Sequence, residues 1–208
     1  MVWHTVPKFV QRLFPERIWE GDPSDGQIYL TFDDGPVPGV TDFVLNELAK
    51  RSQKASFFMV GDNVQKYPSL AREVISSGHG IGNHTFNHLN GWKTSDVDYM
   101  KNVERCDSVL EDMLNVRSVL FRPPYGLMKR SQAKVLIQSK KVVMWDVLTG
   151  DYDRSISASA LLKNSIRHTR PGSIVVFHDQ QKTREVLPQV LPDFLDFLTE
   201  RGFKTSLL

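Results

Sequence analysis

Residues 27–36 read Gln-Ile-Tyr-Leu-Thr-Phe-Asp-Asp-Gly-Pro, and this stretch decides the fold. Its first half is apolar and rich in β-branched and aromatic residues, which is typical of a buried strand. Its second half places two carboxylates and a Gly-Pro turn directly after that strand. Further along the chain, short apolar runs alternate with longer helical patterns, and this alternation predicts a parallel sheet.

The expected elements follow from these patterns. Strands are expected at 28–32, 55–60, 80–82, 119–121, 142–147, 174–177 and 203–206. Helices are expected at 40–51, 64–76, 94–115, 129–139, 158–168 and 185–200. Thr94 or Ser95 is the expected N-cap of the longest helix, and Pro188 and Pro192 are expected to break the start of the last. About seven strand–helix units predict a distorted (β/α) barrel of parallel strands, with an open doubly wound sheet as the alternative.

Composition bounds the class of protein. The chain has 208 residues, of which 40% are hydrophobic, and this suits one folded domain over residues 27–208 after an N-terminal cap or extension over residues 1–26. The net charge is only +2 and no basic run alternates with aromatics, so a nucleic-acid partner is not expected. Cys106 is the one cysteine, so no intrachain disulfide can form.

The N-terminal extension carries apolar residues at helical spacing: Val2, Trp3, Val6, Phe9, Val10, Leu13 and Phe14. We expect it to pack on the barrel, and peripheral membrane contact through residues 1–19 is the alternative. Charged residues and prolines interrupt every apolar run, so no signal peptide is evident and a cytoplasmic location is predicted. No run approaches the roughly 20 apolar residues of a transmembrane segment.

Ionisable side chains follow five of the expected strands. They are Asp33 and Asp34, His84 and His88, Arg122 with Tyr125, Asp146 and Asp151, and His178 with Asp179. In an α/β barrel the carboxyl ends of all strands point to one face, where active sites are built. We therefore expect these groups to form one site.

Two histidines four residues apart suggest a metal site. If the segment from His84 to His88 starts a helix, both imidazoles point the same way and can share one cation. A carboxylate from another strand end would complete a three-ligand site with open positions for water, as in catalytic zinc sites. The adjacent carboxylates of Asp33 and Asp34 repel each other, and a cation relieves that cost. The remaining histidines expected to be structural are His4, His79 and His168.

Acid and base candidates flank this set. Arg122 precedes two prolines that fix the backbone, and a guanidinium near Asp33 would keep that carboxylate ionised and oriented. His178 is the expected general acid on the far side of the substrate from Asp33. Its tautomer needs a carboxylate, for which Asp151 is the first candidate. The rivals are Asp146 and Asp179.

These motifs resemble those of the polysaccharide deacetylase family, the NodB homology domain of carbohydrate esterase family 4. Residues 31–36 match the family's Thr-Phe-Asp-Asp-Gly-Pro motif in full, residues 84–88 match His-Ser/Thr-x-x-His, and residues 122–125 match Arg-x-Pro-Tyr. Two motifs differ: residues 151–152 read Asp-Tyr in place of Asp-Trp, and residues 176–178 read Val-Phe-His in place of Leu-x-His. The resemblance runs from about residue 27 to the C-terminus. It implies a NodB-type catalytic barrel, with pocket shape and substrate left open by the two changes.

The resemblance also implies a reaction, the removal of N-acetyl groups from N-acetylglucosamine-type sugars or polysaccharides. It implies a divalent metal, usually zinc with cobalt or nickel as alternatives, bound by Asp34, His84 and His88. A metal-activated water attacks the acetamide carbonyl in this scheme. The implied roles are Asp33 as general base, His178 as general acid, Arg122 and Asp151 as their orienting partners, the backbone N–H of Tyr125 as an oxyanion donor, and Thr85 as a hydrogen-bonding support of the histidine loop.

The expected partner is an N-acetylated carbohydrate. Sugar rings stack on aromatic faces, so Tyr125, Trp145 and Trp92 are the candidate substrate contacts. Packing in the core or at the rim is the alternative for both tryptophans. Two other functions stay open: the same metal site acting on O-acetyl esters or small cyclic amides and ureides, and an inactive carbohydrate-binding barrel.

Overall fold

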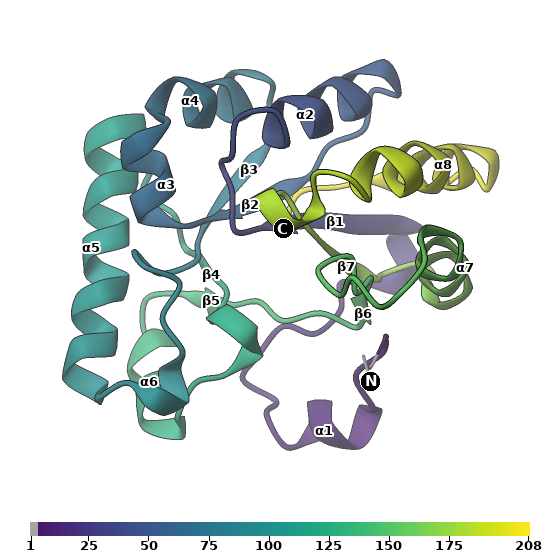
Figure 1. The fold of residues 1–208 in the computed structure, drawn as a ribbon. Coiled ribbons are helices and arrows are strands. Elements are labelled where there is room, and N and C mark those ends of the chain that lie inside the picture. The colour runs from purple at the N-terminus through teal and green to yellow at the C-terminus, as the bar shows by residue number, and fades with distance from the viewer. Residues whose placement is uncertain (1–3) are drawn as a thin grey trace.

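The computed structural model describes residues 4–208, so Val2 and Trp3 of the N-terminal extension lie outside the described range. A parallel sheet forms its centre, in the spatial order β5-β4-β3-β2-β1-β7-β6, with β8 beside β1 (Figure 1). The strands are β1 Gln27–Asp33, β2 Ser56–Met59, β3 Gly80–Asn83, β4 Leu120–Phe121, β5 Lys141–Val142, β6 Val147–Leu148, β7 Ile174–His178 and β8 Lys204–Thr205. The seven strands of the main path curl into a half-barrel, which confirms the predicted distorted barrel.

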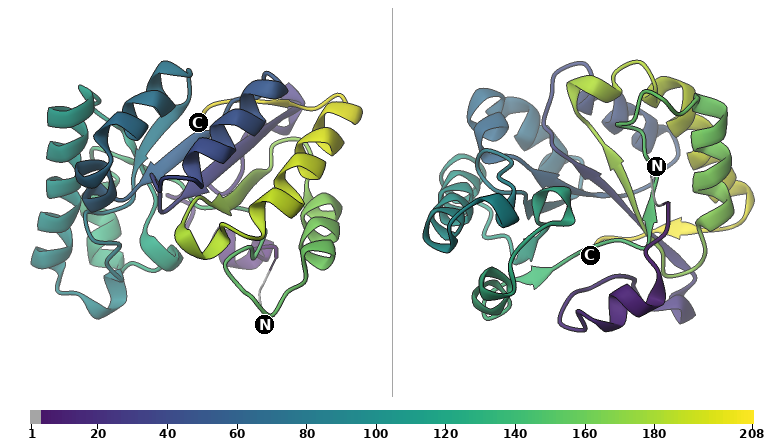
Figure 2. Two further views of the ribbon diagram at one scale, coloured as in Figure 1. Left: turned by 45° about the horizontal axis from the view of Figure 1, so that its top comes forward. Right: turned by 60° about the horizontal axis from the view of Figure 1, so that its bottom comes forward.

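Helices cover the outer face of this curled sheet (Figure 2). They are α2 Thr41–Lys50, α3 Gly61–Lys66, α4 Pro68–Ser76, α5 Asp96–Leu114, α6 Arg130–Leu136, α7 Ala158–His168 and α8 Leu187–Glu200. The short helix α1 Lys8–Arg12 belongs to the N-terminal segment. Short 3₁₀ turns lie at η1 Pro23–Asp25, η2 Gly91–Lys93, η3 Pro124–Gly126 and η4 Gln181–Thr183. The Ser95 side chain accepts a hydrogen bond from the backbone N–H of Asp98 at the start of α5, and Asn115 ends that helix in the left-handed conformation.

Successive side chains of β1 point alternately to the hydrophobic core and to the candidate site. Phe32 faces the helices and stacks between Phe57 and Phe177, at ring-centroid distances of 5.2 and 5.9 Å. Its neighbours Thr31 and Asp33 point to the opposite face, because successive side chains of a strand alternate. The inner side of the half-barrel is therefore the side that carries polar groups at the end of β1.

The N-terminal segment lies against the open side of the half-barrel. Ile18 bridges to Val143 in the parallel sense, between the ends of β5 and β6. Trp19 is buried in the apolar cluster that contains Phe121 and Val142. This segment supplies backbone partners where β5 and β6 do not pair with each other. Phe9 and Leu13 of the same segment are 64% and 60% exposed.

Two expected elements are divided, and those two predictions were wrong. The helix expected at 64–76 is two helices, because Pro68 begins α4 and cannot continue the hydrogen-bonding of α3. The strand expected at 142–147 is two short strands, because β5 pairs with β4 whereas β6 pairs with β7.

The prolines of the last helix do not break its start, contrary to expectation. Pro188 lies in the first turn of α8, where its missing N–H has no intrahelical partner to lose. Pro192 lies within the same continuous helix. The apolar face of α8 is fully buried and compensates for the lost backbone bond, with Val190, Leu191 and Phe194 in the main core cluster.

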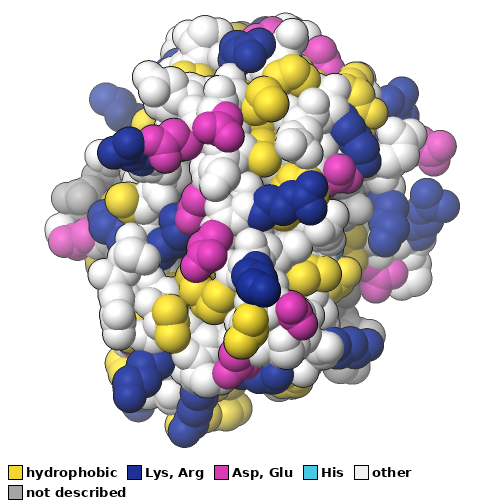
Figure 3. All heavy atoms as spheres, turned by 90° about the vertical axis from the view of Figure 1, so that its left-hand side faces the viewer, with side chains coloured by type: hydrophobic (Ala, Val, Ile, Leu, Met, Phe, Trp, Pro, Cys, Tyr) yellow, Lys and Arg dark blue, Asp and Glu magenta, His cyan; other side chains and the backbone are white. Residues whose placement is uncertain are grey.

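The outer surface is mixed in charge. Figure 3 shows the face over the left-hand helices of Figure 1, where basic and acidic side chains are interspersed with apolar ones. Across residues 4–208, no helix combines the length and the hydropathy that crossing a membrane requires.

Candidate active site

The sheet register brings the predicted groups to one edge. Asp33 at the end of β1 lies opposite His178 at the end of β7. His84 follows β3 and Arg122 follows β4, the strands that extend the sheet on the other side of β1. These ends surround a cavity of about 560 Å³. Its lining includes Asp33, Asp34, His84, His88, Tyr125, Trp145 and His178.

Asp34, His84 and His88 form a cluster that fits a metal ion. One potential ligand atom from each residue lies within 4.8 Å of the others. Asp34 Oδ1 is 3.0 Å from His88 Nε2 and 3.4 Å from His84 Nε2. Asp34 Oδ1 is buried and has no hydrogen-bond partner among the described residues. A buried carboxylate oxygen facing two imidazoles is the donor set expected for a divalent cation.

The tautomer of His84 supports this fit. His84 Nδ1 lies 2.8 Å from the backbone oxygen of Arg122, a bond in which the ring nitrogen must donate. The Nε2 atom of a neutral His84 then carries a lone pair directed at Asp34. Two acceptors that face each other attract only through a cation or a proton. Burial raises the pKa of Asp34, but His84 and His88 outweigh it and hold this pKa well below its usual range.

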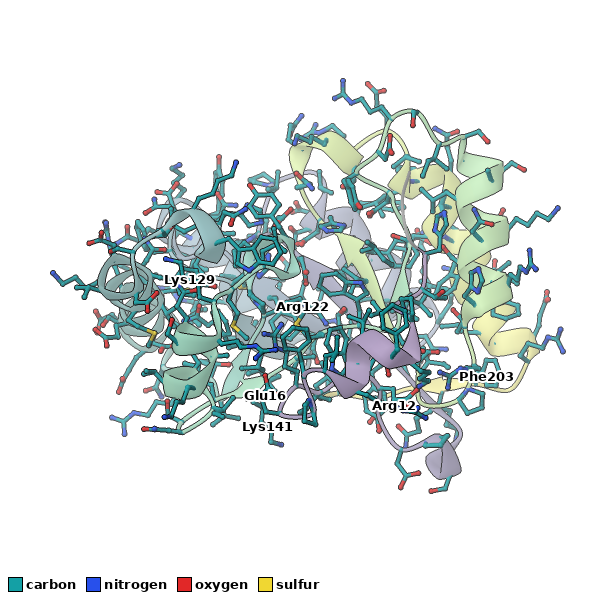
Figure 4. The ribbon with its side chains drawn as sticks, turned by 90° about the horizontal axis from the view of Figure 1, so that it is seen from below. Arg12, Glu16, Arg122, Lys129, Lys141 and Phe203 are labelled. Carbon is teal, nitrogen blue, oxygen red and sulfur yellow. The ribbon has the colours of Figure 1, made fainter. Side chains whose placement is uncertain are left out.

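Arg122 holds Asp33 inside the half-barrel. Its guanidinium donates to Asp33 Oδ1 at 2.6 Å, to Thr31 Oγ1 at 2.8 Å and to the backbone oxygen of Met144 at 2.9 Å. The side chain is fully buried beside the ring of Phe58, 4.1 Å from its centroid, and is drawn near the centre of the molecule in Figure 4. With the backbone oxygen of Val143, to which Nε donates at 3.3 Å, Arg122 has four fixed acceptors. They leave the guanidinium one orientation, so the Asp33 carboxylate is fixed as well.

His178 pairs with Asp151. His178 Nδ1 lies 2.7 Å from Asp151 Oδ1, and the backbone N–H of His178 donates to Asp151 Oδ2 at 2.7 Å. Burial lowers the pKa of His178, but the Asp151 carboxylate outweighs it and raises this pKa to about 9. The imidazole is therefore protonated at neutral pH, with Nδ1 committed to Asp151.

The two rival carboxylates contact other groups. Asp146 accepts from the backbone N–H of Ile174 at 2.8 Å and from Ser173 Oγ at 3.1 Å, at the beginning of β7. Asp179 accepts from the backbone N–H of Gly35 and from Thr41 Oγ1. Burial raises the pKa of Asp146 to about 6 and that of Asp179 to about 8. Within the described residues, the His178 ring is hydrogen-bonded to Asp151 and to neither of these two carboxyl groups.

The three aromatic candidates for substrate contact do not all line the cavity. Tyr125 lines the cavity, and its hydroxyl is 3.2 Å from His88 Nδ1. Trp145 also lines the cavity. Trp92 is not among the lining residues that the structure describes: its Nε1 donates to the backbone oxygen of Met128, and the residue is 62% exposed. A sugar contact by Trp92 stays a prediction for substrates that extend beyond the cavity.

The loop that carries the histidines is held by local hydrogen bonds. Thr85 Oγ1 accepts from the backbone N–H of Leu89 at 3.0 Å, as expected for a support of this loop. Asn102 of α5 accepts from the backbone N–H of Phe86 at 2.8 Å. Several residues of the site have left-handed backbone conformations, which are rare for non-glycine residues and concentrate at functional sites. They are Asp34 (φ 81°), Thr85 (φ 63°), His88 (φ 56°) and Tyr125 (φ 61°).

Sequence reasoning missed several residues of the cavity. Asn63 and Lys182 of η4 line it, whereas Tyr152, which the motif comparison had already associated with the pocket shape, lines it as well. Asn63 donates from Nδ2 to the backbone oxygen of Asp34 at 2.7 Å. Asn63 follows β2, so the rule that polar groups gather after strand ends would have found it. His79, expected to be structural, accepts from the backbone N–H of Ala55 and is buried away from the cavity lining.

A parallel half-barrel that gathers an arginine-held carboxylate, a carboxylate-paired histidine and a candidate metal cluster at its carboxyl edge has the arrangement typical of enzymes with α/β barrels. Residues 20–141 match the sequence model of the polysaccharide deacetylase family, and the chain belongs to this family. The resemblance inferred from the motifs is thereby confirmed.

Individual relatives are deacetylases of N-acetylated glycans. The chain is 30% identical over 180 residues to a peptidoglycan-N-acetylglucosamine deacetylase of Bacillus cereus, over 84% of this chain and 65% of that relative. It thus spans slightly less than two thirds of that relative's length. It is 34% identical over 158 residues to a chitooligosaccharide deacetylase of Azorhizobium caulinodans, over 75% of each chain. The crystal structure of the Bc1960 peptidoglycan N-acetylglucosamine deacetylase superimposes with a TM-score of 0.84 at 27% identity, over 98% of this chain and 95% of that one.

Proposed function

We propose that this protein is a divalent-metal-dependent N-deacetylase that acts on N-acetylglucosamine-type sugars. The observation that carries the proposal is the buried Asp34 Oδ1, which lacks a hydrogen-bond partner among residues 4–208 and faces Nε2 of two histidines. The names of the relatives support the substrate class, because both peptidoglycan N-acetylglucosamine and chitooligosaccharides contain N-acetylated glucosamine units.

Zinc is the metal that this donor set favours. Two imidazoles and one carboxylate leave positions open for water and substrate, as in catalytic zinc sites, and cobalt or nickel accept the same donors. When bound, such a cation polarises the acetamide carbonyl and lowers the pKa of water towards about 7. Asp34, His84 and His88 are the residues that would hold it.

The other residues divide the proton transfers. Asp33, oriented by Arg122 and lining the cavity, accepts the proton of the attacking water. His178 is protonated and lines the cavity too, so it donates its Nε2 proton to the departing amine nitrogen. The backbone N–H of Tyr125 is the proposed donor to the developing oxyanion. Acid and base thus act from β7 and β1, which are adjacent strands.

Acetate release from defined substrates tests the proposal. Metal-free protein would be reloaded with zinc and incubated with N-acetylglucosamine oligomers of increasing length, and acetate and free amine would be measured. We expect both products in equal amounts, dependent on added metal and lost in Asp33→Asn. Zinc-loaded protein that releases no acetate from any N-acetyl sugar would overturn the sugar deacetylase, and hydrolysis of O-acetyl esters alone would favour the esterase alternative.

The cytoplasmic location stays a prediction. In that compartment the substrate would be a soluble or lipid-linked sugar precursor instead of the assembled wall polymer. Fractionation of cells with an antibody to this chain measures the location directly.

A further inference from the structure

The peptide bond between Asp34 and Gly35 is held at both of its polar atoms. Asn63 Nδ2 donates to the backbone oxygen of Asp34 at 2.7 Å. On the other atom of the same peptide, the backbone N–H of Gly35 donates to Asp179 Oδ1 at 3.1 Å. Asn63 comes from α3 and Asp179 directly follows β7, so two separate parts of the fold hold one peptide plane.

Asp179 is itself anchored. It is 1% exposed, and Thr41 Oγ1 donates to its Oδ2 at 2.6 Å. Its backbone N–H donates to the backbone oxygen of Asp33 at 3.0 Å. A Cβ atom placed on Gly35 would lie 2.0 Å from Asp179 Oδ2, so the contact requires glycine for lack of space. The carboxyl group is therefore packed and bonded against the turn that follows β1.

We propose that Asn63 and Asp179 clamp the peptide between Asp34 and Gly35, and that this clamp aims the Asp34 carboxylate at His84 and His88. Both are positioning residues: Asp179 is outside the cluster of potential ligand atoms and reaches it only through the backbone. The inference rests on the proposed metal site.

A clamp is needed because the backbone of Asp34 is strained. Its φ of 81° lies in the left-handed region, which a residue with a side chain leaves unless its surroundings hold it there. Rotation of the following peptide would change ψ of Asp34 and swing its Cβ away from the imidazoles. The carboxylate would then lose the separations of 3.0 and 3.4 Å from the two Nε2 atoms.

The chain offers a matched control at the other end of β7. Asp146 is 4% exposed and accepts from one backbone N–H and one hydroxyl, as Asp179 does, and it differs from Asp179 in an ion pair with the half-exposed Arg170 at 3.3 Å. Its contacts lie at Ser173 and Ile174, where the strand begins. Asp146→Ala therefore removes a comparable buried carboxylate without touching the turn after β1.

Zinc affinity of the metal-free protein, measured by competition with a chromophoric chelator, is the primary readout. Asp179→Ala is expected to weaken zinc binding by about 10- to 100-fold, the range found when groups that orient ligands are removed. Asp179→Asn keeps an oxygen that can accept from Gly35, so it is expected to recover most of the affinity. Asp146→Ala is expected to lower Tm and leave zinc affinity unchanged.

A second pair of variants covers the case in which Asp179→Ala does not fold. Asn63→Ala removes the other half of the clamp and is expected to weaken zinc binding in the same direction. Asp62→Ala, on the adjacent residue, removes only an exposed ion pair with Lys66 and is expected to change nothing.

The outcomes separate the two proposals. Wild-type protein that binds no zinc would overturn the metal site itself. Wild-type protein that binds zinc, with Asp179→Ala and Asn63→Ala binding it equally well, would overturn the clamp alone. An equal loss of affinity in Asp146→Ala would also overturn the clamp, since general destabilisation would then explain the effect.

Discussion

At the scale of single residues, His178 sets a pH dependence with a definite sign. Its folded-state pKa of about 9 lies above the usual histidine value of about 6.5, because the Asp151 carboxylate outweighs burial. The resulting stabilisation is fully present below about pH 6.5 and is lost as the pH rises through about 9. Since a general acid must be protonated, kcat is expected to fall over the same upper range. Imidazole NMR of the metal-free protein measures this pKa.

The control for this prediction is Asp151→Asn. Loss of the carboxylate removes the interaction that raises the pKa of His178 and leaves burial, which lowers it. The variant is expected to titrate at a clearly lower pH than the wild type and to lose activity earlier as the pH rises. A pKa of His178 that does not move in Asp151→Asn would show that this pair does not set the protonation state.

Arg122 is the residue whose loss is expected to cost the most stability. Arg122→Met leaves Asp33, 3% exposed, as a buried charge without its partner, which costs about 3–5 kcal/mol in the free energy of unfolding. Arg122→Lys keeps the charge, but an ammonium has three N–H donors and lacks the planar fork that meets four acceptors here, so an intermediate loss is expected. Urea unfolding measures both, with Arg117→Met as the control, since Arg117 is 85% exposed. Wild-type stability in Arg122→Met would refute the assignment.

At the scale of elements, sequence patterns predicted those whose signals are local. The helix α5 begins after Ser95 and ends at Asn115, because a side-chain cap and a left-handed residue lie at those positions in the chain. Residues 142–147 were predicted wrongly, because one apolar run does not encode that its two halves pair with different strands. Which strands pair with each other in a sheet depends on tertiary contacts, which a local pattern does not encode. The position of Trp92 outside the cavity lining depends on tertiary contacts as well.

Ser95 allows the contribution of a single helix cap, that of α5, to be measured. Its side chain accepts from the backbone N–H of Asp98 at 3.1 Å, and Ser95→Ala leaves that donor of α5 without its cap. The expected loss is about 1 kcal/mol in the free energy of unfolding, with kcat unchanged since the cap is remote from the cavity lining. Chemical denaturation measures it against Ser139→Ala, an exposed serine outside any helix. Equal stability of the two variants would mean that the cap contributes nothing.

At the scale of the whole molecule, the site depends on strand order. Chain positions 33, 84, 122 and 178 are far apart in sequence but meet because β1 lies between β2 and β7 in one parallel sheet. The rule that parallel strands end on one face was enough to predict this convergence. The same rule places Asn63 and Asp179 near this edge, but it could not predict that their side chains hold backbone atoms of the turn after β1, because backbone contacts have no residue motif.

Metal removal is expected to change the stability of the whole domain. A cation that binds only the folded state stabilises it by about 2.7 kcal/mol at a free concentration of 100 times Kd. For a domain of this size, each kcal/mol shifts Tm by about 2–4 °C. Chelation should therefore lower Tm by roughly 5–10 °C and abolish acetate release, and zinc should restore both. Scanning calorimetry with and without zinc measures the shift.

Two variants show where that shift originates. Asp34→Asn removes a charged ligand from the candidate metal site, so its Tm is expected to respond only weakly to zinc. His79→Asn alters a buried histidine that bonds to the backbone of Ala55, so it is expected to lower Tm in both states and keep the zinc-dependent difference. A wild-type Tm that is the same in chelator and in zinc contradicts the metal site. A zinc-dependent Tm shift that persists in Asp34→Asn but disappears in His79→Asn would place the metal elsewhere. The reason is that His79 does not belong to the candidate cluster of Asp34, His84 and His88.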